Sequence, residues 1–373
     1  KKGWCFMRKV LIFVIDGCAP EYLTEKTAPD IFRLAKQDGG FVKTVQAAVP
    51  TVTNVNHACI LSGAFPEDTH VIGNYYYNRQ TGEQGFIESH GFMKAPTILQ
   101  RYQAAGGKTA LLTVKGKVLE VFGEGVHLGL SVQNPDPSLL EKLELAPPPQ
   151  VQSPDSSRWI FHAAYQCIKK ESPDLVYCTT NDFVMHHYGP DAPQAKEQIC
   201  TLNHYVQKIH NLDPDREIYI TADHGMNQKT TIINLQNIFD EACLPVVCVP
   251  PLKDRYIENH IYQEGGALYL YLSNRKKEDS VLKLLADLPA VERTLSSEEA
   301  ARLYRLPEGE IGDYMVFAAK NCAFGEVEGR QLHTNQVRTH GSLYERTVPL
   351  VAINSAAPAG QYFYSRDIVR HLL

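Results

Sequence analysis

Short, nearly continuous runs of apolar residues recur along the chain and predict buried strands. These runs cover residues 10–15, 109–114, 175–179 and 218–221. Each has the length of a strand, and an unbroken apolar run is typical of a strand covered on both faces. Between them, apolar residues at helical spacing predict helices at 28–36, 95–105, 156–169 and 195–209. This alternation favours a mostly parallel sheet wrapped by helices.

The pattern changes between residues 227 and 335. Strand-like runs there read LPVVCVPP, GGALYLYLS and GDYMVFAAKN, with helical stretches at 278–288 and 297–304 between them. The chain then returns to a core-like apolar run at 347–355 and a final helix. We therefore expect a discontinuous α/β core made of residues 1–226 and 336–373, with 227–335 as an inserted, smaller α+β domain. The proline-rich segment 145–157 is predicted to be a surface loop.

Composition narrows the class of protein. A chain of 373 residues, 44% of them hydrophobic, can bury a large core. The formal charge of −5 does not favour binding of nucleic acid, and we expect no such partner. No apolar run approaches the roughly 20 residues that cross a bilayer, so we expect no membrane partner either. The apolar run 10–15 is too short for a secretory signal and is interpreted as a strand. Nine cysteines without a CxxC pair favour reduced thiols and a cytoplasmic location.

Acidic and histidine side chains recur beside the ends of the predicted strands. They are Asp16 in VIDG, Asp182 and His186 in TTNDFVMHHYGPD, Asp223 and His224 in TADHGM, and His340 in RTHGS. Ligands of open α/β sheets bind at the carboxyl ends of strands, so these clusters can converge. Carboxylate and imidazole suit a divalent metal such as zinc, and the set is large enough for two ions that clamp a phosphoryl group. Singly, each cluster also fits a turn, a helix cap or a surface histidine.

A polar, proline-led turn precedes a helical pattern in AAVPTVTNVNHACILSG. Thr53 or Asn54 could cap this helix, because Ser, Thr and Asn are preferred caps. Alternatively, the hydroxyl of Thr53 lies at a helix N-terminus because an anion such as a phosphate or phosphonate binds there. The stretch alone favours capping.

Six segments together resemble the alkaline phosphatase superfamily, and most closely its branch of nucleotide pyrophosphatase/phosphodiesterases and phosphonoacetate hydrolase. They are VIDGCAPEYL, PTVTNVNHACILSG, IGNYYYN, TTNDFVMHHYGPD, TADHGMN and HGSLYERTVPLVAIN, spread over about residues 9–355. The resemblance implies the superfamily's mostly parallel sheet flanked by helices, two zinc ions and Thr53 as the nucleophile. It assigns one zinc to Asp16, Thr53, Asp223 and His224, and the other to Asp182, His186 and His340. Asn74 would donate to a phosphoryl oxygen, and manganese or iron could replace zinc.

The substrate depends on a lysine pair, Lys115 and Lys117, in LLTVKGKVLEVFGEG. By charge pattern alone the pair is typical of a solvated face. Phosphonoacetate hydrolases carry a similar Lys-x-Lys pair that binds the substrate carboxylate, although Gly116 stands where an acidic residue is expected. The resemblance thus implies cleavage of a small carboxylated phosphonate, through a phosphothreonine, to acetate and phosphate.

Two alternatives stay open at this point. One is a phosphodiesterase or nucleotide pyrophosphatase with a base held by the tyrosines of 75–77, which could equally be packing residues. The other is a non-catalytic protein that captures phosphonate. The insertion resembles the cap of phosphonoacetate hydrolases, and a homodimer is one expectation for the assembly.

Overall fold

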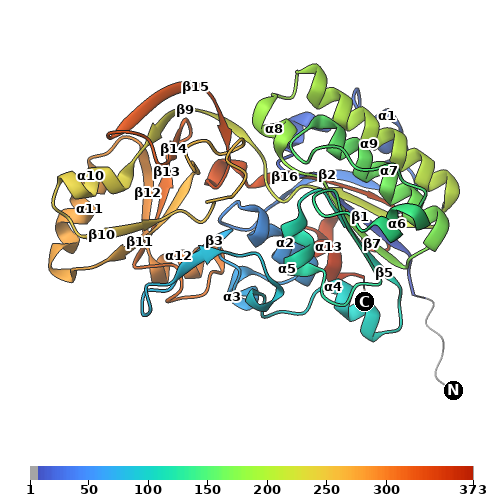
Figure 1. Ribbon diagram of the computed structural model, residues 1–373, viewed down its shortest axis with the longest axis horizontal. Coiled ribbons are helices and arrows are strands. Elements are labelled where there is room, and N and C mark those ends of the chain that lie inside the picture. The colour runs from blue at the N-terminus through green and yellow to red at the C-terminus, as the bar shows by residue number, and fades with distance from the viewer. Residues whose placement is uncertain (1–6, 373) are drawn as a thin grey trace.

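A seven-stranded sheet forms the centre of the computed structural model, which describes residues 7–372 (Figure 1). In spatial order its strands are β2 (Phe41–Gln46), β16 (Thr347–Ile353), β8 (Glu217–Thr221), β1 (Val10–Val14), β7 (Leu175–Thr179), β5 (Thr109–Thr113) and β6 (Leu128–Ser131). Strand β16 runs antiparallel to both of its neighbours, and the pairs β1–β7, β1–β8, β5–β6 and β5–β7 are parallel. The predicted α/β class with a mostly parallel sheet is confirmed.

Helices cover both faces of this sheet (Figure 1). One layer holds α1 (Pro29–Ala35), α7 (Pro154–Glu171) and α9 (Pro193–Leu212), and the other holds α2 (Thr53–Ser62), α4 (Ile98–Ala104), α5 (Gly116–Phe122) and α13 (Asp367–Arg370). The predicted loop 145–157 is wrong in its last residues, because α7 begins at Pro154. Proline suits the first position of a helix, where its missing N–H costs nothing.

A second lobe is built on a four-stranded antiparallel sheet (Figure 1). Its order is β10 (Val246–Val249), β11 (Ala267–Leu272), β13 (Tyr314–Ala318) and β12 (Val291–Ser296), and its helices are α10 (Leu235–Glu241), α11 (Glu278–Ala286) and α12 (Ser297–Tyr304). The chain leaves the core along β9 (Asn227–Ile233) and returns along β15 (Gln331–Thr339), which pairs antiparallel with β9. This lobe coincides with the segment that we expect to be an inserted domain, and its exact limits stay a prediction.

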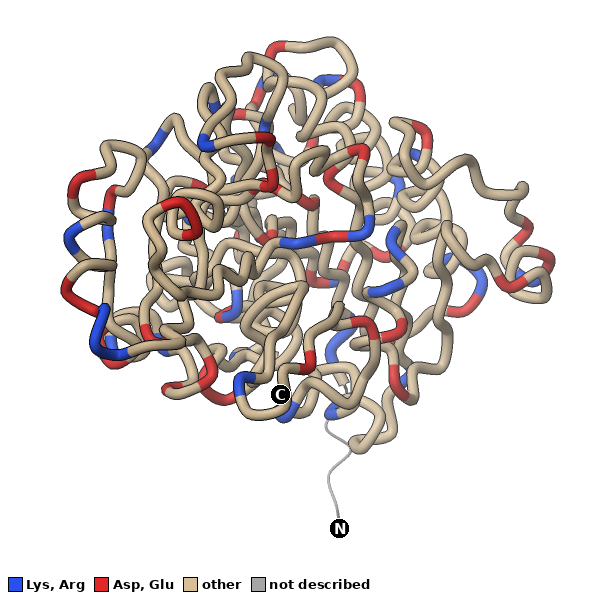
Figure 2. Tube along the Cα trace, turned by 60° about the vertical axis from the view of Figure 1, so that its left-hand side comes forward, with Lys and Arg blue, Asp and Glu red and all other residues tan. Residues whose placement is uncertain are grey.

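Charged residues of both signs are spread over the structure (Figure 2), and the described cysteines are unpaired. Basic and acidic residues are interspersed over both lobes (Figure 2). In the described range, eight cysteines are free thiols, and Cys5 lies outside that range. No helix within residues 7–372 is long and apolar enough to span a membrane.

Candidate metal centre

The predicted ligands converge at one edge of the central sheet. Asp16 follows β1, Asp182 follows β7 and Asp223 follows β8, and these three strands are parallel neighbours. Their carboxyl ends therefore lie side by side, as expected for the ligand site of an α/β sheet. Because β16 runs in the opposite direction, His340, which precedes it in the chain, comes to the same edge.

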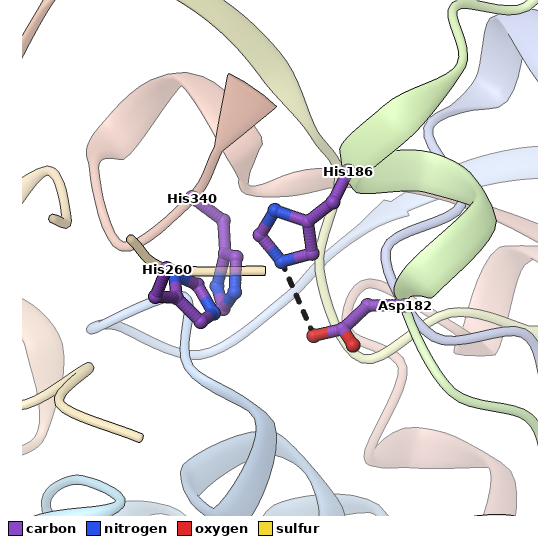
Figure 3. A group of neighbouring side chains, drawn as sticks. All are labelled: Asp182, His186, His260 and His340. Atoms are coloured by element: carbon purple, nitrogen blue, oxygen red, sulfur yellow. Dashed lines mark ion pairs between the residues drawn. The ribbon is translucent and has the colours of Figure 1, made fainter. Parts of the chain in front are cut away.

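One group of side chains contains Asp182, His186 and His340, together with a residue that the sequence analysis did not assign, His260 (Figure 3). One potential ligand atom of each lies within 4.8 Å of those of the others, and all four residues are buried. Asp182 directly precedes α8 (Phe183–His187), so one helical turn brings its Oδ2 to 3.4 Å from His186 Nε2. His260 comes from the loop between β10 and β11, where no motif marks it.

A second group contains Asp16, Thr53, Asp223 and His224. Nε2 of His224 lies 3.5 Å from Asp16 Oδ1 and 3.2 Å from Asp223 Oδ2. The Thr53 hydroxyl lies 3.3 Å from the same Nε2. The structure thus brings together the four side chains that the resemblance assigns to one ion.

His57 lies beside the second group, since one of its ring nitrogens is within 4.8 Å of ligand atoms of Asp16 and Asp223. Its Nδ1 is 2.6 Å from the hydroxyl of Tyr177. Burial, followed by the charge of Lys115, lowers the pKa of His57 to about 3, so the ring is neutral. These contacts agree with a hydrogen-bonded structural role for His57.

Three of the predicted ligand histidines have their tautomer set by the backbone. The Nδ1 atoms contact carbonyl oxygens, in the pairs His186–Arg338 at 2.6 Å, His224–Gly225 at 3.0 Å and His340–Thr51 at 2.7 Å. A carbonyl oxygen only accepts, so Nδ1 carries the hydrogen and Nε2 keeps its lone pair for the site. Several buried atoms at the site have no hydrogen-bond partner among the described residues: Asp16 Oδ1, Asp182 Oδ2, His186 Nε2, Asp223 Oδ2 and His340 Nε2. This donor set fits two divalent cations.

The charges of the buried side chains also favour cations at this site. Burial, together with the charges of Asp182 and Asp223, raises the pKa of Asp16 well above its usual value, and burial raises the pKa of Asp223 to about 6. The single ammonium group of Lys115 lies 3.0 Å from Asp16 Oδ2 and 2.8 Å from Asp182 Oδ1. Burial opposes the charge of Lys115, but these two carboxylates raise its pKa well above the usual value. Lys115 thus pairs with two of the three buried carboxylates and not with Asp223, and divalent cations would supply the missing charge.

Thr53 does not act as a helix cap. Helix α2 begins at Thr53, its N-cap position is Val52, and no side chain at that position accepts a hydrogen bond. Instead, the N–H of Asn54 donates to Oδ1 of Asn74 at 3.0 Å. The expectation that Thr53 or Asn54 caps the helix is wrong, because Asn74 supplies the acceptor from outside. The Thr53 hydroxyl is directed at His224 instead.

The two lysines are buried rather than solvated. Lys115 is 1% and Lys117 is 8% exposed. Lys117 Nζ lies 2.5 Å from Oδ2 of Asp254, and Asn74 Nδ2 donates to the same oxygen at 3.2 Å. Burial would raise the pKa of Asp254, but Lys117 and Lys115 lower it, so the carboxylate is ionised. Two groups expected to bind anionic parts of a substrate therefore converge on one carboxylate of the β10–β11 loop, which sequence reasoning missed.

The three tyrosines of β3 (Tyr75–Tyr77) each pack against another aromatic ring. The ring centroids are 5.2 Å apart for Tyr75–Phe86, 5.1 Å for Tyr76–Phe92 and 4.9 Å for Tyr77–Tyr271. These contacts favour packing between β3 and its surroundings over an open platform for a base.

Comparison with known proteins identifies the family. The model of the type I phosphodiesterase / nucleotide pyrophosphatase family matches residues 10–343. The chain belongs to this family. The resemblance inferred from the six sequence segments is confirmed, and family membership agrees with the predicted hydrolase class.

Curated relatives in the phosphodiesterase family are distant and longer. An uncharacterized pyrophosphatase/phosphodiesterase of Schizosaccharomyces pombe is 23% identical over 63% of this chain and 48% of its own length. Human ectonucleotide pyrophosphatase/phosphodiesterase family member 7 is 23% identical over 58% of this chain and 48% of its own length. The chain therefore spans about half the length of these relatives, and 26% of a Macrovipera lebetinus venom phosphodiesterase.

Solved structures match over nearly the whole chain. Phosphonoacetate hydrolase from Sinorhizobium meliloti 1021 in complex with phosphonoacetate has a TM-score of 0.87 at 25% identity, covering 98% of this chain and 96% of that one. The same enzyme with phosphonoformate gives 0.86 at 26% identity, with the same coverage. Murine ectonucleotide pyrophosphatase / phosphodiesterase 5 shares the fold, with a TM-score of 0.68 at 17% identity over 98% of this chain and 94% of that one.

Proposed function

We propose that the chain is a metal-dependent hydrolase that cleaves the C–P bond of phosphonoacetate, or of a close small carboxylated phosphonate. The observation that carries the proposal is a donor set for two cations beside two buried ammonium groups, those of Lys115 and Lys117. The similarity to phosphonoacetate hydrolase over 98% of the chain supports the substrate class.

Thr53 is the nucleophile in this proposal. Its Oγ forms a bond to phosphorus while the C–P bond breaks, and the acetate carbon leaves with the electron pair and takes up a proton. Water then releases phosphate from the phosphothreonine. Two divalent cations, most simply zinc, bound by the two Asp/His groups would lower the pKa of the attacking hydroxyl and balance the charge on the phosphoryl oxygens. The positive end of the α2 helix dipole favours the same anion.

The lysines have a role in stabilising the leaving group. The carbanion of acetate is stabilised as its enolate, so negative charge grows on the carboxylate as the bond breaks. Ammonium groups beside that carboxylate bind the transition state more tightly than the substrate. Lys115 is paired with Asp16 and Asp182, which are expected metal ligands, so cations would compete with Lys115 for them and leave its ammonium available. Lys117 would exchange part of its contact with Asp254 for the substrate.

A phosphodiesterase or nucleotide pyrophosphatase activity is the second candidate, because the family match and the curated relatives carry that description. Both activities use the same cation site and nucleophile. They differ in what holds the leaving group, which is a carboxylate subsite in one case and a base subsite in the other.

A direct comparison of substrates tests the proposal. Zinc-loaded protein is assayed for phosphate release from phosphonoacetate and for nitrophenol release from p-nitrophenyl thymidine monophosphate. We expect phosphonoacetate to be the better substrate by kcat/KM. Efficient hydrolysis of the diester without phosphate release from phosphonoacetate would favour the second candidate. No turnover of either, with tight phosphonate binding, would point to a non-catalytic protein.

A further inference from the structure

His260 lies among the expected ligands of one cation, although it comes from the second lobe (Figure 3). Its ring is edge-on to that of His186, with centroids 4.4 Å apart and an interplanar angle of 82°. Its centroid lies 5.5 Å from that of His340. Donors about 2.1 Å from a tetrahedral zinc ion stand about 3.4 Å apart, so a group of four donors within 4.8 Å of one another needs little contraction to bind one.

The burial of the His260 ring calls for a binding partner at its Nδ1 atom. The residue is 1% exposed, and its Nδ1 has no hydrogen-bond partner within the part of the chain that the structure describes. A buried polar group without a partner is costly. A cation at the centre of the group would satisfy the ring of His260 together with the unpaired Nε2 atoms of His186 and His340.

The loop that carries His260 is held in place by its own contacts. Gln263 accepts a hydrogen bond from the N–H of Asp254 at 2.8 Å and donates to the carbonyl of the same residue at 2.9 Å. Asn259 Nδ2 donates to Oδ1 of Asp182 at 2.8 Å, while Oδ2 of Asp182 faces His186. Two adjacent loop residues thus act on the same group, one orienting a carboxylate and the other presenting an imidazole.

We infer that His260 is a fourth protein ligand of the cation bound by Asp182, His186 and His340. The inference rests on the cation site of the proposed function but on no particular substrate. Three imidazoles and one carboxylate suit zinc or another borderline ion, whereas the group around Asp16 is richer in oxygen donors. The two sites therefore differ in metal preference, and the β10–β11 loop contributes to the affinity of only one of them.

Metal titration tests the inference without an activity assay. Protein stripped by a chelator is titrated with zinc, for the unmodified chain, His260→Ala and the matched control His162→Ala. His162 lies on α7, outside both groups, is half-buried, and also has an unpaired Nδ1. We expect His260→Ala to weaken one of the two zinc sites by about 10–100-fold and leave the other unchanged. His162→Ala should match the unmodified chain in both. Unchanged affinity of both sites in His260→Ala would overturn the inference.

A second variant covers the case in which His260→Ala does not fold. In His260→Cys loaded with cobalt, direct ligation gives a thiolate-to-cobalt charge-transfer band in the near ultraviolet that cobalt-loaded unmodified protein lacks. Absence of this band in a folded, cobalt-loaded variant refutes ligation by residue 260. If zinc titration or the cobalt band shows ligation by residue 260 in a protein that releases no phosphate from phosphonoacetate, only the proposed substrate is contradicted.

Discussion

Lys117 and Asp254 form a buried ion pair, with 2.5 Å between Nζ and Oδ2, although they are 137 positions apart in the chain. The pair joins the first turn of α5, which follows β5, to the loop between β10 and β11. It also places the carboxylate of Asp254 beside the ammonium group of Lys117, which is expected to bind the carboxylate of the substrate. Under the proposed function, Asp254 would therefore compete with the substrate for Lys117.

Asp254→Asn is expected to lower the KM for phosphonoacetate. The amide keeps a hydrogen-bonding group beside Lys117 and Asn74 but removes the negative charge that repels the substrate carboxylate. We expect a decrease of about tenfold, or about 1.4 kcal/mol, with kcat nearly unchanged. Steady-state kinetics of phosphate release measure it. Asp313→Asn, a buried acid paired with Arg79 and Arg275 in the second lobe, is the control and should leave KM unchanged. A higher KM in Asp254→Asn would show instead that Asp254 positions Lys117.

Thr53→Ala should lose turnover by about a thousandfold or more, because the hydroxyl proposed to attack phosphorus is absent. Thr53→Ser should keep part of the rate. Thr51→Ala is a close control, since this hydroxyl is also buried but donates to the carbonyl of Ser342 at 2.8 Å. It should cost about 1 kcal/mol of stability and leave the chemistry intact. If Thr51→Ala abolished phosphate release while Thr53→Ala did not, the nucleophile would be misassigned.

Lys115→Met should destabilise the metal-free protein and strengthen metal binding. Without its ammonium group, the buried carboxylates of Asp16 and Asp182 lose their cationic partner, at a cost of about 3–5 kcal/mol. Zinc should then bind more tightly, because no ammonium competes for these ligands, and it should restore most of the stability. Thermal melts with zinc and with chelator measure both effects.

The control for this experiment is Lys36→Met, which breaks an exposed pair with Glu25. It should change stability by less than about 1 kcal/mol in either condition. A Lys115→Met protein as stable as the unmodified chain in the presence of chelator would show that Lys115 does not compensate the site.

Glu345→Gln should remove part of the acid sensitivity of folding. Burial would raise the pKa of Glu345, but Lys229, at 2.9 Å, and hydrogen bonds from Ser342 and Asn227 lower it below 4.5. A group with a depressed folded pKa stabilises the fold fully above its unfolded pKa and loses this contribution as the pH falls through the folded value. The stability difference between the unmodified chain and Glu345→Gln should therefore be about 3–5 kcal/mol at pH 7 and shrink below about pH 4.5.

Urea unfolding at pH 7 and at pH 4 measures the difference. Glu25→Gln, in the exposed pair with Lys36, should show almost none at either pH. An equal loss at both pH values would mean that the carboxylate charge of Glu345 is not what stabilises this region.

The core sheet could be predicted because its strands are buried on both faces. Strands β1, β5, β7 and β8 are fully buried, so apolar residues dominate their sequences. The edge strand β2 was missed, because its exposed residues, Val42 and Thr44, alternate with partly buried ones and Lys43 interrupts the apolar run. Strand β6 was missed as well, since it is short and contains Gly129.

Some residues of the candidate site could also be predicted from the sequence and others could not. Residues at the ends of core strands, such as Asp16 and Asp223, could be found because the strand pattern gives their position. Asp254, Asn259 and His260 could not, because they lie in an irregular loop with no periodicity. Their contacts with Lys117, Asp182 and His186 depend on how the second lobe folds onto the first.

The chain crosses between the lobes along two paired strands, β9 and β15, that start and finish within a few residues of His224 and His340. The rings of these two histidines are stacked, with centroids 3.6 Å apart. The segment between these two strands, residues 234–330, could be shortened, enlarged or replaced by an unrelated fold without breaking any hydrogen bond of the seven-stranded sheet. Such an exchange would replace Asp254 and His260 together, so the surroundings of Lys117 and of one proposed cation would change, while Thr53, Asp16 and Asp223 would keep their places at the sheet.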